Sequence, residues 1–162
     1  MEKQIDTILV LDFGSQYTQL IARRIRELNV FSVILPWDIN VEKIKSLKPK
    51  GVILSGGPES VTDSNTPRIP EIIFKLDVPV LGICYGMQTL AEQFGGQVSS
   101  SKNKEFGHAQ VLLEKPSLLF DGFSSGSSID VWMSHGDNVS TLPDKFNLIA
   151  STKSAPIAAM EH

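Results

Sequence analysis

The sequence predicts an α/β fold with a mostly parallel sheet, helices on both of its faces, and antiparallel strands added in the C-terminal half. Two observations lead to this fold class. Strand-like and helix-like patterns alternate as far as Gly96, and such alternation is typical of a parallel sheet covered on both faces. Beyond Gly96 only strand-like runs follow, separated by Ser/Gly/Asp-rich loops. The 162 residues are enough for one domain with a sizeable core.

The alternating half contains strands and helices in turn. Its strands are expected in four short apolar runs: 7–11, 30–35, 51–54 and 78–83. The first helix should present one apolar face, made of Tyr17, Leu20, Ile21, Ile25 and Leu28. Three more helices are expected: 41–47 capped by Asn40, 69–76 with Pro70 near its start, and 85–94 ended by Gly95 and Gly96.

The C-terminal half should add antiparallel strands to the same domain. Its strand candidates are four further runs: 109–113, 129–133, 146–150 and 156–160. The serine-rich stretches 99–101 and 124–128 are typical of loops, and both are too short to link separate domains. We therefore expect residues 1–162 to form one domain.

Composition and charge exclude several classes of protein. Lys and Arg number 15 against 18 Asp and Glu, and the net charge of −3 gives no support for a nucleic-acid-binding surface. No apolar run is long enough to span a bilayer, and the start of the chain lacks the pattern of a secretory leader. We expect a cytoplasmic protein without nucleic-acid or membrane partners, in a compartment that keeps Cys84 reduced.

Cys84 lies in the most informative stretch of the chain. An apolar strand pattern meets a Gly-x-Cys-x-Gly turn at residues 82–86, and a helical pattern follows at once. This is the cysteine version of a nucleophile elbow, in which a tight turn favours glycine on both sides of the nucleophile. The start of the following helix should favour the thiolate. The alternative interpretation is a buried core cysteine, and the two flanking glycines argue against it.

A second loop could hold the negative charge that develops when a thiolate attacks a carbonyl group. In an elbow, one oxyanion donor is the backbone N–H of the residue after the nucleophile, here Tyr85. The loop Ser-Gly-Gly-Pro at residues 55–58 also follows a strand, and Gly57 can bring its N–H close because it has no side chain. Without the elbow, the loop would be interpreted as an ordinary turn.

The sequence does not identify the general base. His135, in a Ser-His-Gly-Asp stretch that follows a predicted strand, is one candidate, but sequence cannot place it next to Cys84. His108 is better explained by a structural role. His162 is the last residue, and an unsupported terminal imidazole is a poor base.

Four spaced motifs, at 12–24, 55–60, 82–88 and 130–137, resemble those of class I (triad-type) glutamine amidotransferases, and within them the GMP synthetase family. The resemblance implies a flavodoxin-like sheet and hydrolysis of glutamine to glutamate and ammonia. It implies that Cys84 forms a glutamyl thioester and that the Gly57 and Tyr85 amides hold the oxyanion. It also implies that four residues border the glutamine pocket: Gln88, Ser134, His135 and Asp137.

The resemblance further implies which partners and cofactors to expect. This domain should need no metal or cofactor, and its substrate should be glutamine. Ammonia should pass to a C-terminal ATP-pyrophosphatase domain, which uses ATP and Mg²⁺ to convert xanthosine monophosphate to GMP in an enzyme expected to be a homodimer. That synthetase domain is absent from the present sequence.

One departure from the family pattern leaves an alternative open. The family's base and its carboxylate partner lie in a His-Pro-Glu segment, whereas this sequence ends at Glu161 and His162. We therefore expect a C-terminally incomplete amidotransferase domain that turns over little glutamine alone. The alternative is a non-catalytic ligand-binding or docking module on the same fold. A stand-alone cysteine hydrolase or chaperone is disfavoured by the opening Asp-Phe-Gly-Ser-Gln motif.

Overall fold

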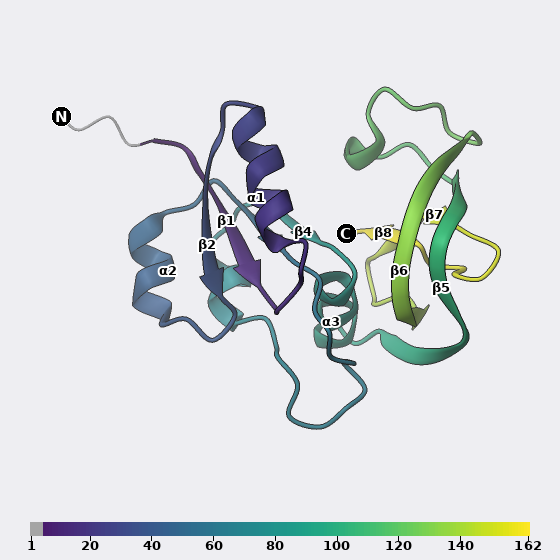
Figure 1. Cartoon of the computed structure of the whole chain (residues 1–162), viewed down its shortest axis with the longest axis horizontal. Coiled ribbons are helices and arrows are strands. Elements are labelled where there is room, and N and C mark those ends of the chain that lie inside the picture. Colours follow the sequence, from purple (N-terminus) through teal and green to yellow (C-terminus); the bar gives the residue numbers. More distant parts are fainter. Residues whose placement is uncertain (1–4) are drawn as a thin grey trace. The chain divides into compact units, whose positions relative to one another are not determined.

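The computed structural model describes residues 5–162, apart from the side chains of residues 101–105 and of His135 (Figure 1). The described chain divides into two compact units, Met1–Leu90 and Ala91–His162. Among the described residues, no helix combines the length and the apolar character needed to cross a membrane.

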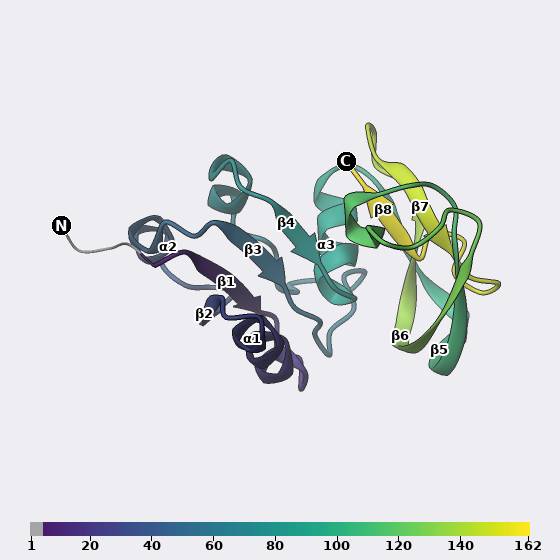
Figure 2. The same cartoon turned by 90° about the horizontal axis from the view of Figure 1, so that it is seen from above.

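The first unit is built on a four-stranded parallel sheet. Its strands are β1 (Thr7–Asp12), β2 (Phe31–Pro36), β3 (Gly51–Leu54) and β4 (Val80–Gly82), in the order β2-β1-β3-β4 (Figure 2). The two central strands supply the buried core of this sheet: Leu9, Val10 and Leu11 from β1, and Val52 and Leu54 from β3. The predicted parallel sheet is confirmed, and all four of its strands lie where the sequence placed them.

Helices cover both faces of this sheet. They are α1 (Thr18–Glu27), α2 (Val41–Leu47), the 3₁₀-helix η1 (Glu71–Lys75) and α3 (Tyr85–Gln93). In Figure 1, α1 and α2 lie on opposite sides of the sheet. The predicted cap of α2 is present, because the Asn40 side chain accepts a hydrogen bond of 2.8 Å from the Glu42 N–H.

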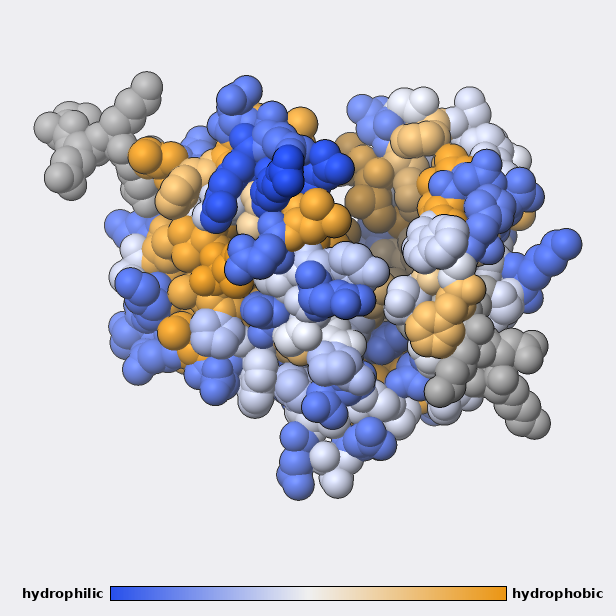
Figure 3. Space-filling view, in the orientation of Figure 1, coloured by the Kyte–Doolittle hydropathy of each residue, from blue (hydrophilic) through white to orange (hydrophobic). Residues whose placement is uncertain are grey.

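The apolar face expected for α1 is only partly buried. The helix buries Thr18 and Ala22 fully, whereas Leu20 and Leu28 are 45% and 76% exposed. The buried face is therefore rotated relative to the predicted one, since small residues allow α1 to approach β2 closely. Figure 3 shows hydrophilic side chains gathered over α1 and apolar ones at the position of the edge strand β2.

The second unit is built on an antiparallel sheet. Its strands are β5 (Gln97–Leu113), β6 (Ser128–Thr141), β7 (Asn147–Ser151) and β8 (Ala159–Glu161), in the order β6-β5-β7-β8, with the short 3₁₀-helix η2 (Leu118–Phe120) after β5. Its core gathers Val111, Leu113 and Ala150. The predicted antiparallel strands are confirmed, but they form a sheet of their own.

The strands β5 and β6 are much longer than the sequence predicted. The stretch 99–101, expected to be a loop, lies within β5, and residues 134–137, expected to follow a strand, lie within β6. The two strands pair from Gln97 opposite Thr141 to Leu112 opposite Ser128, with shifts of register after Gln97 and between Ser100 and Glu105. Each strand satisfies the other's backbone groups, so pairing overrides the weak strand preference of these polar residues.

Candidate active site

The turn between β4 and α3 has the tight geometry that the sequence predicted. A Cβ atom on Gly82 would lie 2.8 Å from the Met87 nitrogen, and one on Gly86 would lie 2.4 Å from the Leu54 carbonyl oxygen. Real Cβ contacts are not so short, so both positions need glycine. Between them Cys84 has a φ of +49°, in the left-handed region that side-chain-bearing residues rarely adopt. This strained backbone is typical of an elbow that presents a nucleophile.

Cys84 is an exposed residue at the start of α3, where its carbonyl oxygen accepts a 3.0 Å bond from the Gln88 N–H. Protein atoms nonetheless exclude water from its sulfur, and this desolvation raises the pKa of the Cys84 thiol above its ordinary value. This direction is opposite to the one expected from the start of the helix, because desolvation penalises the charged thiolate. A raised pKa makes a base more important, because the thiol proton must leave before the sulfur can attack.

The raised pKa predicts the pH dependence of Cys84 alkylation. Only the thiolate reacts with iodoacetamide, so the rate should rise with pH and reach half its maximum at a higher pH than for free cysteine. The measurement is the rate of mass gain at Cys84 across a pH series, with N-acetylcysteine as the reference thiol. A midpoint at or below that of the reference would contradict the desolvation described above.

The left-handed backbone of Cys84 predicts an unusual order of variant stabilities. Glycine adopts positive φ without a Cβ clash, so Cys84→Gly should be more stable than Cys84→Ala by about 1 kcal/mol. Thermal unfolding of the two variants tests this order. Alanine is usually the more stable choice where the backbone is relaxed, so a Cys84→Ala variant equal to or more stable than Cys84→Gly would show that the elbow carries no strain.

The predicted oxyanion loop packs tightly against the loop after β1. A Cβ atom on Gly57 would lie 2.6 Å from the Phe13 carbonyl oxygen, and one on Gly14 would lie 3.2 Å from Cδ of Pro58. Gly57 lies outside the helices and strands, and within the described chain its N–H donates to no protein acceptor. The geometry leaves this N–H available to a ligand.

Tyr85, whose N–H is the second predicted oxyanion donor, is held firmly by its side chain. The residue is only 2% exposed, and its hydroxyl donates a 2.7 Å hydrogen bond to the Pro67 carbonyl oxygen. Its ring also packs against Phe13, with ring centroids 5.4 Å apart. The first turn of α3 is thereby fixed on the same loops that surround Cys84.

The remaining predicted site residues fall in different parts of the chain. Gln88 is buried in the first unit, one helical turn after Cys84. Ser134, His135 and Asp137 lie in the second unit, within β6, opposite residues of β5. The side chain of His135 lies outside the described residues. The role of these four residues in binding glutamine stays a prediction.

The first unit contains no histidine, because all three histidines of the chain lie beyond residue 90. Nε2 of His108 lies 2.9 Å from Oδ1 of Asp130 on the exposed face of the second sheet. The ring of His162 packs against those of Phe94 and Phe146, with centroids 6.4 and 5.1 Å away. The contact of His108 with Asp130 agrees with the structural role that the sequence suggested for His108.

Two serines near the elbow were not predicted as site residues. A Cβ atom on Gly56 would lie 3.5 Å from Oγ of Ser15 and 3.6 Å from Cβ of Cys84, so Ser15 and Cys84 flank the same glycine. Ser55 is completely buried beneath this glycine's loop. The location of the two serines in the sequence could have indicated that they lie in the site. Both follow the carboxyl ends of parallel strands, where ligands bind in open α/β sheets.

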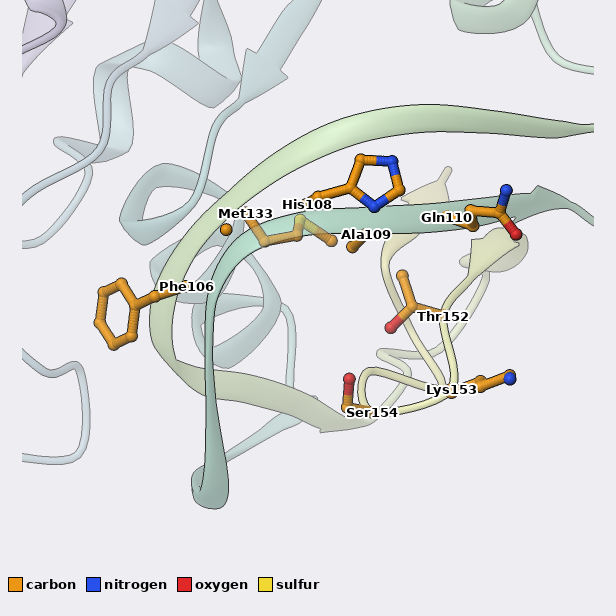
Figure 4. Close-up of a pocket in the computed structure, with 9 residues that line it drawn as sticks. Phe106, His108, Ala109, Gln110, Met133, Thr152, Lys153 and Ser154 are labelled. Carbon is orange, nitrogen blue, oxygen red and sulfur yellow. The ribbon is translucent and has the colours of Figure 1, made fainter.

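The second unit has a separate surface cavity of about 500 Å³. Its wall consists of nine residues: Phe106, Gly107, His108, Ala109, Gln110, Met133, Thr152, Lys153 and Ser154. In Figure 4, the loop after β7 lies on the opposite side of β5 from the His108 ring. Among the described residues no group of three or more His, Cys, Asp or Glu side chains could hold a metal ion.

The parallel sheet, the strained cysteine elbow and the adjoining glycine loop together define an amidotransferase type of domain. Residues 9–162 match the family described as Glutamine amidotransferase class-I, and the chain belongs to that family. More particularly, it is 55% identical over its whole length to a glutamine-hydrolysing GMP synthase of Hamiltonella defensa and 59% identical over 94% of its length to that of Teredinibacter turnerae. It spans 32% and 30% of these relatives, about a third of their length.

Solved structures resemble the chain over nearly its full length. A protein of Thermoplasma acidophilum that is assigned to GMP synthase is 31% identical, with a TM-score of 0.81, and the match covers 99% of this chain and 80% of that one. A glutamine amidotransferase from Thermotoga maritima has a TM-score of 0.75 at 22% identity, covering 99% and 73% of the two chains. The second likeness supports the fold alone.

Proposed function

We propose that this chain is the glutaminase domain of a GMP-forming enzyme and that Cys84 is its nucleophile. The observation that carries the proposal is the left-handed Cys84, held between two glycines that tolerate no side chain. Beside it lies the Gly56–Gly57 loop, in which the Gly57 N–H donates to no acceptor among the described residues. The relatives named as glutamine-hydrolysing GMP synthases support the choice of glutamine and of GMP formation.

The chemistry proceeds by acyl transfer. After a base removes the Cys84 proton, the sulfur attacks the side-chain amide carbon of glutamine and the carbonyl electrons move onto oxygen. The Gly57 and Tyr85 N–H groups stabilise this oxyanion. The protonated base gives its proton to the amide nitrogen, and collapse of the intermediate breaks the C–N bond and releases ammonia. Water then hydrolyses the glutamyl thioester, which yields glutamate and regenerates the Cys84 thiol.

We propose that the base is a histidine from outside residues 1–90, because that unit contains none. Gln88 extends the site from α3, and Ser134, His135 and Asp137 are proposed to complete the glutamine pocket from β6. No metal or cofactor takes part in this step, since a thiolate and two N–H donors suffice for acyl transfer.

The relatives are about three times as long as this chain, so the complete enzyme is proposed to carry a C-terminal synthetase domain. In that domain ATP and Mg²⁺ would activate xanthosine monophosphate, and the ammonia released at Cys84 would aminate it to GMP. A cytoplasmic homodimer is the form that we propose for this enzyme.

The proposal is tested by trapping the intermediate in the full-length gene product. Rapid acid quenching after addition of glutamine should leave a glutamyl group on Cys84, detected as a mass gain on the peptide that contains it. Glutamate should leave the peptide unmodified. A folded protein that neither accumulates this adduct nor releases ammonia from glutamine would favour the non-catalytic binding module.

A further inference from the structure

Ser55, the residue directly after β3, joins the three loops that form the candidate site. Its N–H donates a 3.0 Å bond to the Leu11 carbonyl at the end of β1, and its own carbonyl accepts a 3.0 Å bond from the Gly86 N–H in the elbow. The residue is 0% exposed. Its backbone is thus fixed on both sides by neighbouring parts of the site.

The hydroxyl group of Ser55 makes two further hydrogen bonds. The hydroxyl oxygen accepts a 3.0 Å hydrogen bond from the Phe13 N–H, and the hydroxyl O–H donates a 2.8 Å hydrogen bond to the Gly56 carbonyl oxygen. Both bonds are buried, so each group would be left unsatisfied at a cost if the hydroxyl were absent. The hydroxyl therefore links the loop after β1 to the oxyanion loop.

The bond to Gly56 fixes the direction of a different group, the Gly57 N–H. The Gly56 carbonyl and the Gly57 N–H belong to the same peptide unit, which is planar and trans, so they point in opposite directions. Two consecutive glycines otherwise leave this peptide free to rotate, because neither has a Cβ atom. Restraining the oxygen therefore restrains the N–H.

We propose that Ser55 is a positioning residue that holds the Gly56–Gly57 peptide in the orientation that presents the Gly57 N–H to the oxyanion. The proposal rests on the proposed glutaminase function and deepens it. Gly56 lies directly beside Cys84, as the 3.6 Å distance from its added Cβ to that of Cys84 shows. The peptide that Ser55 holds is thus next to the nucleophile.

The decisive variant is Ser55→Ala in the full-length gene product. It removes the hydroxyl and keeps both backbone bonds, so kcat for glutamine hydrolysis should fall about ten- to a hundredfold, somewhat less than the loss of a whole oxyanion donor. KM should change less than about threefold, because the oxyanion exists only in the transition state. Alkylation of Cys84 by iodoacetamide, which creates no oxyanion, should keep its wild-type rate.

Two further variants separate positioning from a merely structural role. Ser32→Ala removes another buried hydroxyl of the same unit. Ser32 lies on the edge strand β2, and its hydroxyl donates a 3.1 Å hydrogen bond to the Ala22 carbonyl oxygen in α1. Ser32→Ala should lower the melting temperature as Ser55→Ala does and leave kcat unchanged. Ser55→Thr keeps the hydroxyl and should restore most of kcat.

Three results would overturn the proposal: an unchanged kcat in Ser55→Ala, equal losses of kcat in Ser55→Ala and Ser32→Ala, or a parallel fall of kcat and Cys84 alkylation. A wild-type enzyme inert towards glutamine would refute the proposed function instead. In that case the amide NMR signal of Gly57 still tests the positioning role of Ser55. This signal should be single in the wild type and broadened or doubled in Ser55→Ala. Identical Gly57 signals in the two proteins would refute the positioning role.

Discussion

Replacing Cys84 by alanine is expected to abolish glutamine hydrolysis, with a loss of about 10⁶ in kcat, the size seen when a covalent nucleophile is removed. The elbow places Cys84 alone at the end of β4, and it is the only cysteine of the chain. No neighbouring thiol can replace it. Ammonia release from glutamine by the full-length gene product is the measurement.

The control is amination with added ammonia, which bypasses Cys84. If a synthetase domain follows this chain, Cys84→Ala should form GMP from ammonia at the wild-type rate while failing with glutamine. Thermal unfolding should show that the variant is folded. Substantial glutamine hydrolysis by this folded variant would mean that Cys84 is not the nucleophile.

The elbow could be predicted from the sequence because its requirements are local. Gly82 and Gly86 flank Cys84 within five residues, and each is needed for a backbone contact that no side chain permits. The same holds for the tight packing of Gly57 on Phe13. The strand positions in the first unit were equally predictable, because the apolar runs of its central strands are the residues that the sheet buries, whereas the apolar face of α1 was not placed correctly.

Features that depend on distant contacts could not be predicted. Residues 134–137 have a loop-like composition, but β5 supplies a partner for their backbone and makes them part of β6. The raised pKa of Cys84 depends on the desolvation of its sulfur, which sequence spacing does not reveal. The hydrogen bond between the Phe13 N–H and the Ser55 hydroxyl joins residues 42 positions apart in the chain.

The second large effect is expected for Gly57→Val, which should lower kcat for glutamine hydrolysis about 10²- to 10³-fold, or about 2.7–4 kcal/mol of transition-state stabilisation. A Cβ atom at this position would lie 2.6 Å from the Phe13 carbonyl oxygen. The Gly57 backbone and the Phe13 carbonyl oxygen both belong to packed loops. The Gly57 peptide must therefore shift, and its N–H moves away from the position of the oxyanion. KM should change little, because the N–H acts on charge that develops after binding.

Gly51→Ala is the matched control for Gly57→Val. Its added Cβ would lie 3.1 Å from Cδ1 of Ile8, the flexible end of a side chain, at the start of β3 and not at its active-site end. It should alter stability and leave kcat near the wild-type value. Turnover and thermal unfolding of both variants, in the full-length gene product, form the test. If folded Gly57→Val hydrolyses glutamine at the wild-type rate, the oxyanion donor is not Gly57, and the positioning role of Ser55 fails with it.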